Sequence, residues 1–530
     1  MKVSLTFLAC LIIFAASAQT PSVKWYYDLH DVSFGQTSAM DVDNDGKLEL
    51  VFSTYWNDSN VYMLNAEDGS LKWKHQQPGP LGGCNDAGPL IFDPFHNGNY
   101  KIVIPGSCMD TTFCLDADSG YVQWKTVSGG GDSPPTAADI DNDGELEVLH
   151  GTFDGHVICL NGKTGAVKWS KLIDTNSAIE SEPLIFDANN DGLPDFAVGT
   201  WNLTYMNSVT NHYDSNFVAC YNGQTHDLIW KKPVADLVYH GPACGDIDRD
   251  GKPELTIGDY NGYVYSLNGE DGSQNWRATG NYYVGAPTTL ADLDRDGYLD
   301  IIYCDAYNVT ALKHDSSLLW TYAIPRNGTA FRGVTVADVN NDSILDVSFG
   351  TSMGDVISLD GLTGNAIRSI RLDSVYNDTF EIDNAPIIAD FDHDGVLDLF
   401  IIGGKTRYPN TVIDYGRAYC LSWGIGNGPD WTMFRRDIHR TACVCDSAGL
   451  PLGVVSPKMG KSNALKAYPN PFTNELNIAS SMHGSFHIFD IVGREVYSGI
   501  LNNQKGLINT AMFMPGLSCW SSDMKMVALS

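Results

Sequence analysis

The sequence predicts an all-β protein, an eight-bladed β-propeller followed by a small C-terminal β-sandwich. Glycine is abundant, with 52 residues among 530, and Asn-Gly and Asp-Gly pairs recur, which favours many short strands joined by turns. An acidic segment recurs along the chain, and a second segment that ends in tryptophan alternates with it. Successive acidic segments begin between 46 residues (Asp93 to Asp139) and 59 residues (Asp187 to Asp246) apart. This spacing is typical of propeller blades, each of which is one four-stranded sheet.

Residues 1–18 are predicted to be a secretory signal peptide. Lys2 supplies the positive start, an apolar stretch runs to Ala15, and an Ala-Ser-Ala site precedes Gln19. No later segment is apolar for long enough to span a bilayer as a helix. We therefore expect a secreted or cell-surface protein with no transmembrane segment.

The acidic segment reads DVDNDGKLEL in its first copy, and an apolar strand follows it. Carboxylate or amide side chains occupy positions 1, 3, 5 and 9, and most copies have a glycine at position 6 that permits a sharp bend. A degenerate copy, DPFHNGNYKI from Asp93, lacks the acids at positions 3 and 5, so we expect a plain turn there. The full copies begin at Asp41, Asp139, Asp187, Asp246, Asp292, Asp338 and Asp390.

Several carboxylates on one loop repel one another unless a cation lies among them. Oxygen ligands on a flexible loop favour Ca²⁺ over Zn²⁺, which prefers His or Cys. EF-hand and dockerin sites are disfavoured because Phe52 occupies position 12 of the first loop, where an EF-hand has Glu, and a β-type sequence follows in place of a helix. The alternative is a set of Asp/Asn-Gly turns without an ion. The predicted ligands of several structural Ca²⁺ ions are Asp41, Asp43, Asp45, Glu49, Asp139, Asp141, Asp143, Glu147, Asp187, Asn189, Asp191, Asp195, Asp246, Asp248, Asp250, Glu254, Asp292, Asp294, Asp296, Asp300, Asp338, Asn340, Asp342, Asp346, Asp390, Asp392, Asp394 and Asp398.

The second segment reads LNAEDGSLKW in its first copy, which indicates a strand, a tight turn and an outer strand that ends in tryptophan. Residues 22–29 resemble an outer strand with no partner before it, whereas the last unit lacks an outer strand of this type. The N-terminal strand is therefore expected to complete the last blade and to hide two sheet edges. The count is eight blades, or seven if the unit at Asp93 is an insertion.

The cysteines lead to two expectations. Cys114, Cys159 and Cys220 recur at one position of similar strands and are expected to be buried thiols. The pairs Cys84 with Cys108 and Cys443 with Cys445 are candidates for oxidation outside the cell.

The acidic loops resemble the FG-GAP/VCBS repeats of integrin-α-like propellers, and the tryptophan strands are similar to those of eight-bladed quinoprotein-like propellers. The resemblance covers residues 22–442 and implies Ca²⁺ binding through positions 1, 3, 5 and 9 and the backbone carbonyl of position 7. Residues 430–442 resemble a segment that often borders such propellers. The predicted propeller domain spans 19–446, and a linker follows at 447–464.

The C-terminal segment AYPNPFTNELNI, together with FHIFDIVGREVYSG, resembles the type A sorting domain of type IX secretion in Bacteroidota. The resemblance implies export across an outer membrane and the secretion machinery as a partner. The predicted domain spans 465–530, and alternation of apolar residues in its segments indicates a small β-sandwich. The residues after Leu517 depart from the family pattern, which leaves their role in sorting open.

Common enzyme motifs, such as H-E-x-x-H, G-x-S-x-G and the P-loop, do not occur. The net charge of −31 disfavours nucleic acids and anionic membranes as partners. Function is instead expected on the upper-face loops, which differ from blade to blade. Those that lead into the inner strands carry Glu180, Glu182, Tyr239, Tyr282, Arg326 and Asp383 among others. The predicted ligand-binding residues are Trp201, Tyr205, Tyr213, His240, Tyr283, Arg332 and Tyr408.

The sequence favours a calcium-stabilised binding or adhesion module whose partner is a glycan or a protein. The first alternative is an enzyme, most plausibly a polysaccharide lyase, with His240 as base and Arg332 as the group that neutralises an acidic sugar. The second alternative is a purely structural surface protein. No catalytic residue is assigned.

Overall fold

The computed structural model describes residues 20–444 except 56, 78–84, 108, 205, 208–211, 214, 374–379, 406–414, 427, 432 and 438, together with strands between 466 and 529. The chain divides into two compact units, Met1–Val454 and Val455–Ser530. Within the described parts, the helical content is one short 3-10 turn, η1 (Pro325–Asn327), so no helix there could cross a membrane.

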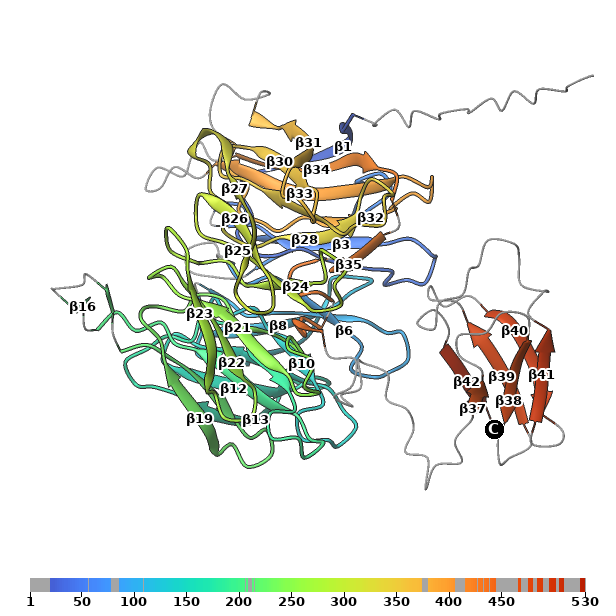
Figure 1. The fold of residues 1–530 in the computed structure, drawn as a ribbon, viewed down its shortest axis with the longest axis horizontal. Helices are drawn as coiled ribbons and strands as arrows, with labels where there is room; N and C mark the ends of the chain where they lie inside the picture. Colours follow the sequence, from blue (N-terminus) through green and yellow to red (C-terminus); the bar gives the residue numbers. More distant parts are fainter. Residues whose placement is uncertain are drawn as a thin grey trace, which may run out of the picture. The chain divides into compact units, whose positions relative to one another are not determined.

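The first unit is an eight-bladed propeller in which each blade has four antiparallel strands (Figure 1). The first blade contains β2 (Ser38–Met40), β3 (Glu49–Ser53), β4 (Asn60–Asn65) and β5 (Leu71–Gln76), and the second contains β6 (Leu90–Phe92), β7 (Lys101–Ile104), β8 (Thr111–Asp116) and β9 (Val122–Val127). The third contains β10 (Thr136–Ala138), β11 (Glu147–Gly151), β12 (His156–Asn161) and β13 (Val167–Leu172). The fourth contains β14 (Leu184–Phe186), β15 (Asp195–Gly199), β18 (Phe217–Tyr221) and β19 (Leu228–Pro233). Between β15 and β18, β16 (Met206–Asn207) pairs with β17 (His212–Tyr213).

The remaining blades continue the same order around the ring. The fifth blade contains β20 (Ala243–Gly245), β21 (Glu254–Gly258), β22 (Tyr263–Asn268) and β23 (Gln274–Thr279), and the sixth contains β24 (Thr289–Ala291), β25 (Asp300–Cys304), β26 (Asn308–Leu312) and β27 (Leu318–Ala323). The seventh contains β28 (Thr335–Asp338), β29 (Asp346–Gly350), β30 (Asp355–Leu359) and β31 (Ala366–Arg371). The eighth contains β32 (Ile387–Ala389), β33 (Leu397–Lys405), β34 (Tyr415–Gly424) and β1 (Ser22–Leu29).

The ring closes as expected, because β1 forms the outer strand of the eighth blade. It pairs antiparallel with β34, with Tyr26 opposite Tyr419, so the two ends of the propeller share one sheet (Figure 1). The unit at Asp93 forms a complete blade of its own, β6 to β9. The eight-bladed prediction is confirmed, and the seven-bladed alternative is wrong.

Tryptophans of the outer strands join neighbouring blades. Trp73 Nε1 donates a hydrogen bond of 2.8 Å to the Ala117 carbonyl in the turn of the next blade, and Gly120 of that turn packs flat on its ring. Gly120 has φ +70°, and a Cβ there would lie 2.7 Å from the ring. A hydrogen bond to a turn carbonyl one blade further on is also made by Trp25, Trp124, Trp230, Trp276 and Trp320. Trp73 itself is half-buried, so these rings pack between blades rather than within one sheet.

We call residues 428–444 the axial segment, because it touches the inner part of blades on all sides of the ring. Its β35 (Gly428–Trp431) pairs with β28, and its β36 (Cys443–Val444) runs parallel to β20. Arg440 donates hydrogen bonds of 2.7 and 2.6 Å to the carbonyls of Gly88 and Pro89, which precede β6. A segment that contacts the second, fifth and seventh blades in this way crosses the propeller axis.

The axial segment is also held by a disulfide between Cys443 and Cys244 of β20. The expected partner Cys445 is therefore wrong, because pairing of β36 with β20 brings two distant residues together. Cys84 and Cys108 lie outside the described residues. Cys114, Cys159 and Cys220 are buried free thiols, as predicted.

The described strands of the second unit form two antiparallel sheets of three strands each, the strand content predicted for a small β-sandwich. The first sheet contains β37 (Lys466–Tyr468), β38 (Glu475–Ala479) and β41 (Lys505–Asn509). The second contains β39 (Gly484–Phe489), β40 (Glu495–Leu501) and β42 (Lys525–Leu529), so the residues after Leu517 contribute an edge strand.

Candidate metal loops and axial site

The acidic loops share one backbone conformation. Position 4 is left-handed, as at Asn44 with φ 60°, and position 6 has φ 90° at Gly46. Ser343 adopts φ 71° at position 6 of the loop that lacks the glycine. The Asp41 carboxylate accepts hydrogen bonds from the backbone N–H groups of Asp45 (3.1 Å) and Gly46 (3.0 Å), which closes the turn. These hydrogen bonds hold the curl of the loop.

The acid at position 9 ties the end of each full loop to its start. Asp300 Oδ2 accepts a hydrogen bond of 2.9 Å from the Leu293 N–H, while its Oδ1 is buried and has no hydrogen-bond partner in the described part of the chain. The corresponding bond to the N–H of position 2 is made by Glu49, Glu147, Asp195, Glu254, Asp346 and Asp398. A buried carboxylate oxygen without a donor is costly unless a cation contacts it.

In five loops three carboxylates converge so that one oxygen of each lies within 4.8 Å of the others. Burial raises the pKa of Asp300 and of Glu254 to about 7, which shows how poorly their negative charge is compensated. These oxygens fit a calcium ion in donor type and spacing. The converging sets are Asp41, Asp43 and Glu49; Asp139, Asp141 and Glu147; Asp246, Asp248 and Asp250; Asp292, Asp294 and Asp300; and Asp390, Asp392 and Asp398.

Lysines enter some of these loops, which the sequence analysis did not foresee. Lys168 Nζ lies 2.6 Å from Asp141, 2.9 Å from Asp143 and 2.9 Å from Glu147. Lys72 and Lys24 occupy the corresponding place in the loops at Asp41 and Asp390, and each, like Lys168, precedes the tryptophan of its outer strand. In these loops an ammonium group supplies positive charge where an ion would.

The loop at Asp246 lacks such a lysine, because Asn275 precedes its tryptophan. The degenerate loop keeps the common backbone, with φ 52° at His96 and φ 78° at Gly98. Its position 9 is Lys101, which pairs with Asp116 at 2.8 Å. A cationic side chain therefore stands at the position of the acid, consistent with the expectation of a turn without an ion.

A second set of side chains lies at the opposite end of the inner strands. In every blade, one residue lies before the inner strand and seven positions before the first residue of the acidic loop. In the second blade this residue is Asp86, which precedes β6, and the loop begins at Asp93, which follows β6. We call these eight residues the axial ring. They are Phe34, Asp86, Asp132, Glu180, Tyr239, Gly285, Phe331 and Asp383. Four are acidic and three are aromatic, so the ring has a composition that no single blade reveals.

The acids of the axial ring interact across blades. Burial, followed by the charge of Asp132, raises the pKa of Asp86 to about 7. Burial and the charges of Asp132 and Asp86 raise the pKa of Glu180 to about 8. Burial also raises the pKa of Asp132 and of Asp383. The four carboxyl groups therefore share one poorly solvated region on the propeller axis.

Arg332 is the cation of this region, and it is only 4% exposed. Its guanidinium lies 5.3 Å from the Tyr239 ring centroid and 5.5 Å from that of Phe331. Among the described residues no carboxylate forms an ion pair with it, and its Nε has no hydrogen-bond partner. Arg332 thus attracts the ring acids from a distance without contacting them.

His240 and Glu182 form a buried pair beside the axial ring. His240 Nδ1 and Glu182 Oε1 are 2.8 Å apart, and Glu182 Oε2 accepts the Gly241 N–H at 2.5 Å. Burial opposes the charge of Glu182, but His240 and Arg435 of the axial segment hold its pKa at about 2. An ionised Glu182 requires the proton on His240 Nδ1, and His240 Nε2 is buried without a partner among the described residues.

Aromatic side chains from neighbouring blades gather around this centre. The Trp201 ring lies 4.9 Å from Tyr260 and 5.3 Å from Tyr239 between centroids, and Tyr260 stacks on Tyr283 at 5.1 Å. Tyr239 in turn lies 5.4 Å from Phe331. All five side chains are partly exposed, so they form one surface rather than a closed core.

Of the predicted ligand-binding residues, the structure brings Trp201, His240, Tyr283 and Arg332 to this one place. Tyr205 and Tyr408 lie outside the described residues, and Tyr213 is described only as part of β17. Arg326 does not join the group: it pairs with Asp355 and Asp373, each at 2.7 Å.

The sequence analysis missed Asp86, Asp132, Tyr260 and Phe331. Asp86, Asp132 and Phe331 each belong to the axial ring, seven residues before the first aspartate of their acidic loop. An alignment of the repeats that starts seven residues before this aspartate would therefore have identified them. Tyr260 follows the second strand of its blade, and no repeated pattern marks it.

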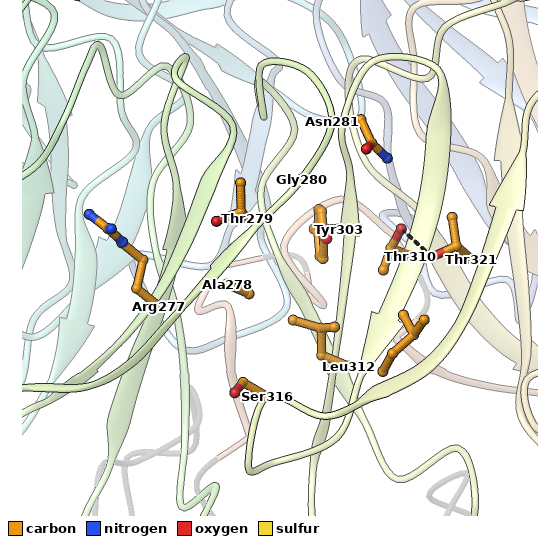
Figure 2. A pocket seen from close by; sticks show the side chains of 11 residues that line it. Arg277, Ala278, Thr279, Gly280, Asn281, Tyr303, Thr310, Leu312, Ser316 and Thr321 are labelled. Atoms are coloured by element: carbon orange, nitrogen blue, oxygen red, sulfur yellow. Dashed lines mark hydrogen bonds between the residues drawn. The ribbon is translucent and has the colours of Figure 1, made fainter.

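A pocket of about 400 Å³ lies elsewhere, between the fifth and sixth blades (Figure 2). Thr279, Asn281 and Tyr303 line it, and Thr310 bonds to Thr321 at 3.2 Å on one side. Its one charged group, Arg277, stacks on Tyr263 at 4.0 Å. The pocket therefore offers hydroxyl and amide groups but no acid or free base, and it carries less chemistry than the axial site.

Comparison with protein families supports the architecture in three regions. Residues 292–348 match the model of an FG-GAP-like repeat, and residues 57–185 match the model named outer membrane protein assembly factor BamB, of the PQQ-like repeat class. Residues 466–518 match the secretion system C-terminal sorting domain. The predicted repeats and sorting domain are confirmed, and the sorting domain indicates export from the cell.

Solved propellers resemble the chain in fold. A europium-containing methanol dehydrogenase is 12% identical, with a TM-score of 0.54 over 76% of this chain and 93% of that one. Quinohemoprotein alcohol dehydrogenase from Comamonas testosteroni is 13% identical, with a TM-score of 0.52 over 77% of both chains. At this identity the likeness concerns the fold alone. No curated protein sequence matches the chain significantly.

Proposed function

We propose that this protein is a secreted or cell-surface binding module whose propeller binds a glycan at the axial site. The observation that carries the proposal is the partly exposed aromatic surface of Trp201, Tyr239, Tyr260, Tyr283 and Phe331 beside the axial ring. Aromatic faces stack on the apolar faces of sugar rings, and carboxylates accept hydrogen bonds from sugar hydroxyl groups. A glycan explains both groups, whereas a flat protein surface would not reach the acids near the axis.

The acidic loops take a different part in this proposal. They lie at the other end of the inner strands from the axial ring, so calcium there stabilises the blades without contacting the ligand. When bound, calcium supplies positive charge to oxygens such as Asp300 Oδ1 that have no donor of their own.

The location rests on two features of the sequence. The C-terminal sorting domain supports export through type IX machinery, and the predicted signal peptide at 1–18, which lies outside the described residues, would direct the first translocation step. A binding module outside the cell also agrees with the strongly negative net charge of −31, which favours solubility.

A glycan array, probed with and without calcium, tests the binding proposal. We expect Trp201→Ala to weaken binding of the selected glycan by about 30-fold, since loss of a central aromatic contact costs about 2 kcal/mol. Tyr121→Ala is the matched control, because this tyrosine is 75% exposed and belongs to the outer edge of the second blade. No bound glycan in either condition, or an equal loss in both variants, would contradict the proposal.

The lyase alternative retains one observation in its favour. His240 Nε2 has no partner among the residues that the structure describes, and Arg332 lies nearby, as a base and a charge-neutralising group would. However, His240 is only 4% exposed, and four acids of the axial ring would repel an acidic sugar. The geometry therefore favours binding of a sugar that is not anionic.

A further inference from the structure

We propose that the axial ring selects glycans that carry protonated amino groups, that is, polymers of amino sugars without N-acetyl groups. This inference rests on the proposed function and specifies its ligand. The ring places Asp86, Asp132, Glu180 and Asp383 around a single guanidinium, that of Arg332. Burial and mutual repulsion keep protons on Asp86 and Glu180 near neutral pH without ligand. An ammonium group on the ligand compensates the negative charge that forms when these carboxyl groups ionise, so binding and ionisation favour each other.

Polar atoms without partners mark the place where the ligand binds. Asn85 is fully buried next to Asp86, and neither its Oδ1 nor its Nδ2 has a hydrogen-bond partner among the described residues. Within the part of the chain that the structure describes, Glu180 Oε2 and Arg332 Nε also have no hydrogen-bond partner, although these residues are only 9% and 4% exposed. The Oδ1 atoms of Asp86 and Asp132 also have no partner among the described residues, and both acids interact electrostatically with Glu180 and Arg332. Buried polar atoms are nearly always hydrogen-bonded, so these atoms on interacting groups point to a polar ligand.

The spacing of the acids argues against a bare metal ion. The groups of three carboxylates that converge within 4.8 Å all belong to the loops on the other face, and none contains a ring acid among the described residues. Ring acids that stand on four different blades are better matched by an organic cation whose hydroxyl groups extend the contacts.

The axial ring has an acidic side and an aromatic side, and this arrangement suits an amino sugar. Three acids occupy consecutive blades, at Asp86, Asp132 and Glu180, while Tyr239 and Phe331 belong to blades on the other side of Glu180. Arg332 covers these two aromatic rings, so it repels a ligand cation toward the acids. A sugar ring can then stack on Trp201 and Tyr260 while its ammonium group faces the carboxylates.

Three oligosaccharides of equal length test the inference by titration calorimetry at pH 6.5 with calcium present. They are a glucosamine oligomer, the N-acetylglucosamine oligomer and a galacturonate oligomer. We expect the glucosamine oligomer to bind at least ten-fold more tightly than its N-acetylated form, and the galacturonate oligomer not to bind. The comparison uses the unaltered protein, so it does not depend on the folding of a variant.

A variant then places the selectivity at the ring. Glu180→Gln should reduce affinity for the glucosamine oligomer by about ten-fold and leave the N-acetylated form unchanged. Asp227→Asn, an exposed acid on the turn before β19, is the control that should change neither.

The outcomes separate this inference from the proposed function. Equal affinity for the two hexosamine oligomers, or preference for another glycan of the array, overturns the amino-sugar inference alone. Failure of every glycan overturns both. Binding of galacturonate with absorbance growth near 235 nm overturns the inference and supports the lyase alternative.

Discussion

Glu180 shows how a single position carries the chemistry of this protein. It aligns with Gly285 and Phe34 of other blades, yet its carboxyl group lies among other acids on the axis. The repeated blade structure gives this position the same backbone in every blade, so its side chain can differ between blades. The axial site is formed by these different side chains at one repeated position.

At this scale we predict a pH dependence of stability. The folded protein retains the Glu180 proton up to a pH near 8, because of burial and the charges of Asp132 and Asp86, with Asp383, Glu182 and Arg332 nearby. The unfolded chain releases that proton at about pH 4. The folded state therefore binds more protons between these values, and its stability without ligand falls as the pH rises through that range.

Glu180→Gln removes this loss of stability. We expect its Tm to equal that of the unaltered protein near pH 4 and to exceed it by a few degrees at pH 8, measured by calorimetry without ligand. Asp227→Asn should show no such trend, since this acid is exposed. A Tm difference for Glu180→Gln that is the same at both pH values would refute the argument.

At the scale of one element, the tryptophan strands explain how blades of different sequence keep one geometry. Five of these rings bond to a turn carbonyl of the next blade and lie against the left-handed glycine of that turn, namely Trp25, Trp73, Trp124, Trp230 and Trp320. Where that residue is His226 instead of glycine, its ring packs 4.4 Å from Trp169. The contact is therefore preserved by a different side chain.

The contact between Trp73 and Gly120 can be tested against a glycine that touches nothing. Gly120→Ala should cost about 1–3 kcal/mol more than Gly144→Ala, because its Cβ would lie 2.7 Å from the Trp73 ring while Gly144 has open space around it. Both glycines have positive φ, 70° and 89°, so the backbone strain is matched. Calorimetry in the presence of a chelator measures the stability of both variants. Equal losses of stability would show that packing of the Trp73 ring does not depend on Gly120.

Element-scale prediction from the sequence succeeded where a pattern repeats. The acidic loop predicted a turn with position 6 in an unusual conformation, and Gly46, Gly144 and even Ser343 have positive φ. It did not reveal the lysines, because Lys168 reaches its acids from an outer strand and only the pairing of strands brings the two together.

At the scale of the molecule, two structural features close the circle of eight blades. β1 completes the eighth blade, where it lies beside β34 (Figure 1). The axial segment holds the centre together through its strands and the disulfide between Cys443 and Cys244. Both connect residues from distant parts of the chain, so they join the ends of the repeat array into one unit.

Calcium removal tests the loops over the whole propeller. A chelator should lower the Tm by many degrees, because each ion that binds only the folded state contributes about 2.7 kcal/mol at one hundred times its dissociation constant. Re-addition of calcium should restore the Tm, whereas magnesium at equal concentration should do so less well. An unchanged Tm, with no calcium found by elemental analysis, would contradict the proposed role.

The sequence by itself determined the all-β class, the propeller architecture, the closure by the N-terminal strand and the turn conformation of the loops, while the structure decided between eight blades and seven. These properties follow from short patterns that recur in every blade, where neighbouring residues decide the local structure. Tertiary structure alone decided that Cys443 pairs with Cys244, that Arg435 holds Glu182, and that Asp86, Asp132, Glu180 and Asp383 lie around Arg332. These contacts join residues from different blades, and only the closed ring brings those residues to one axis.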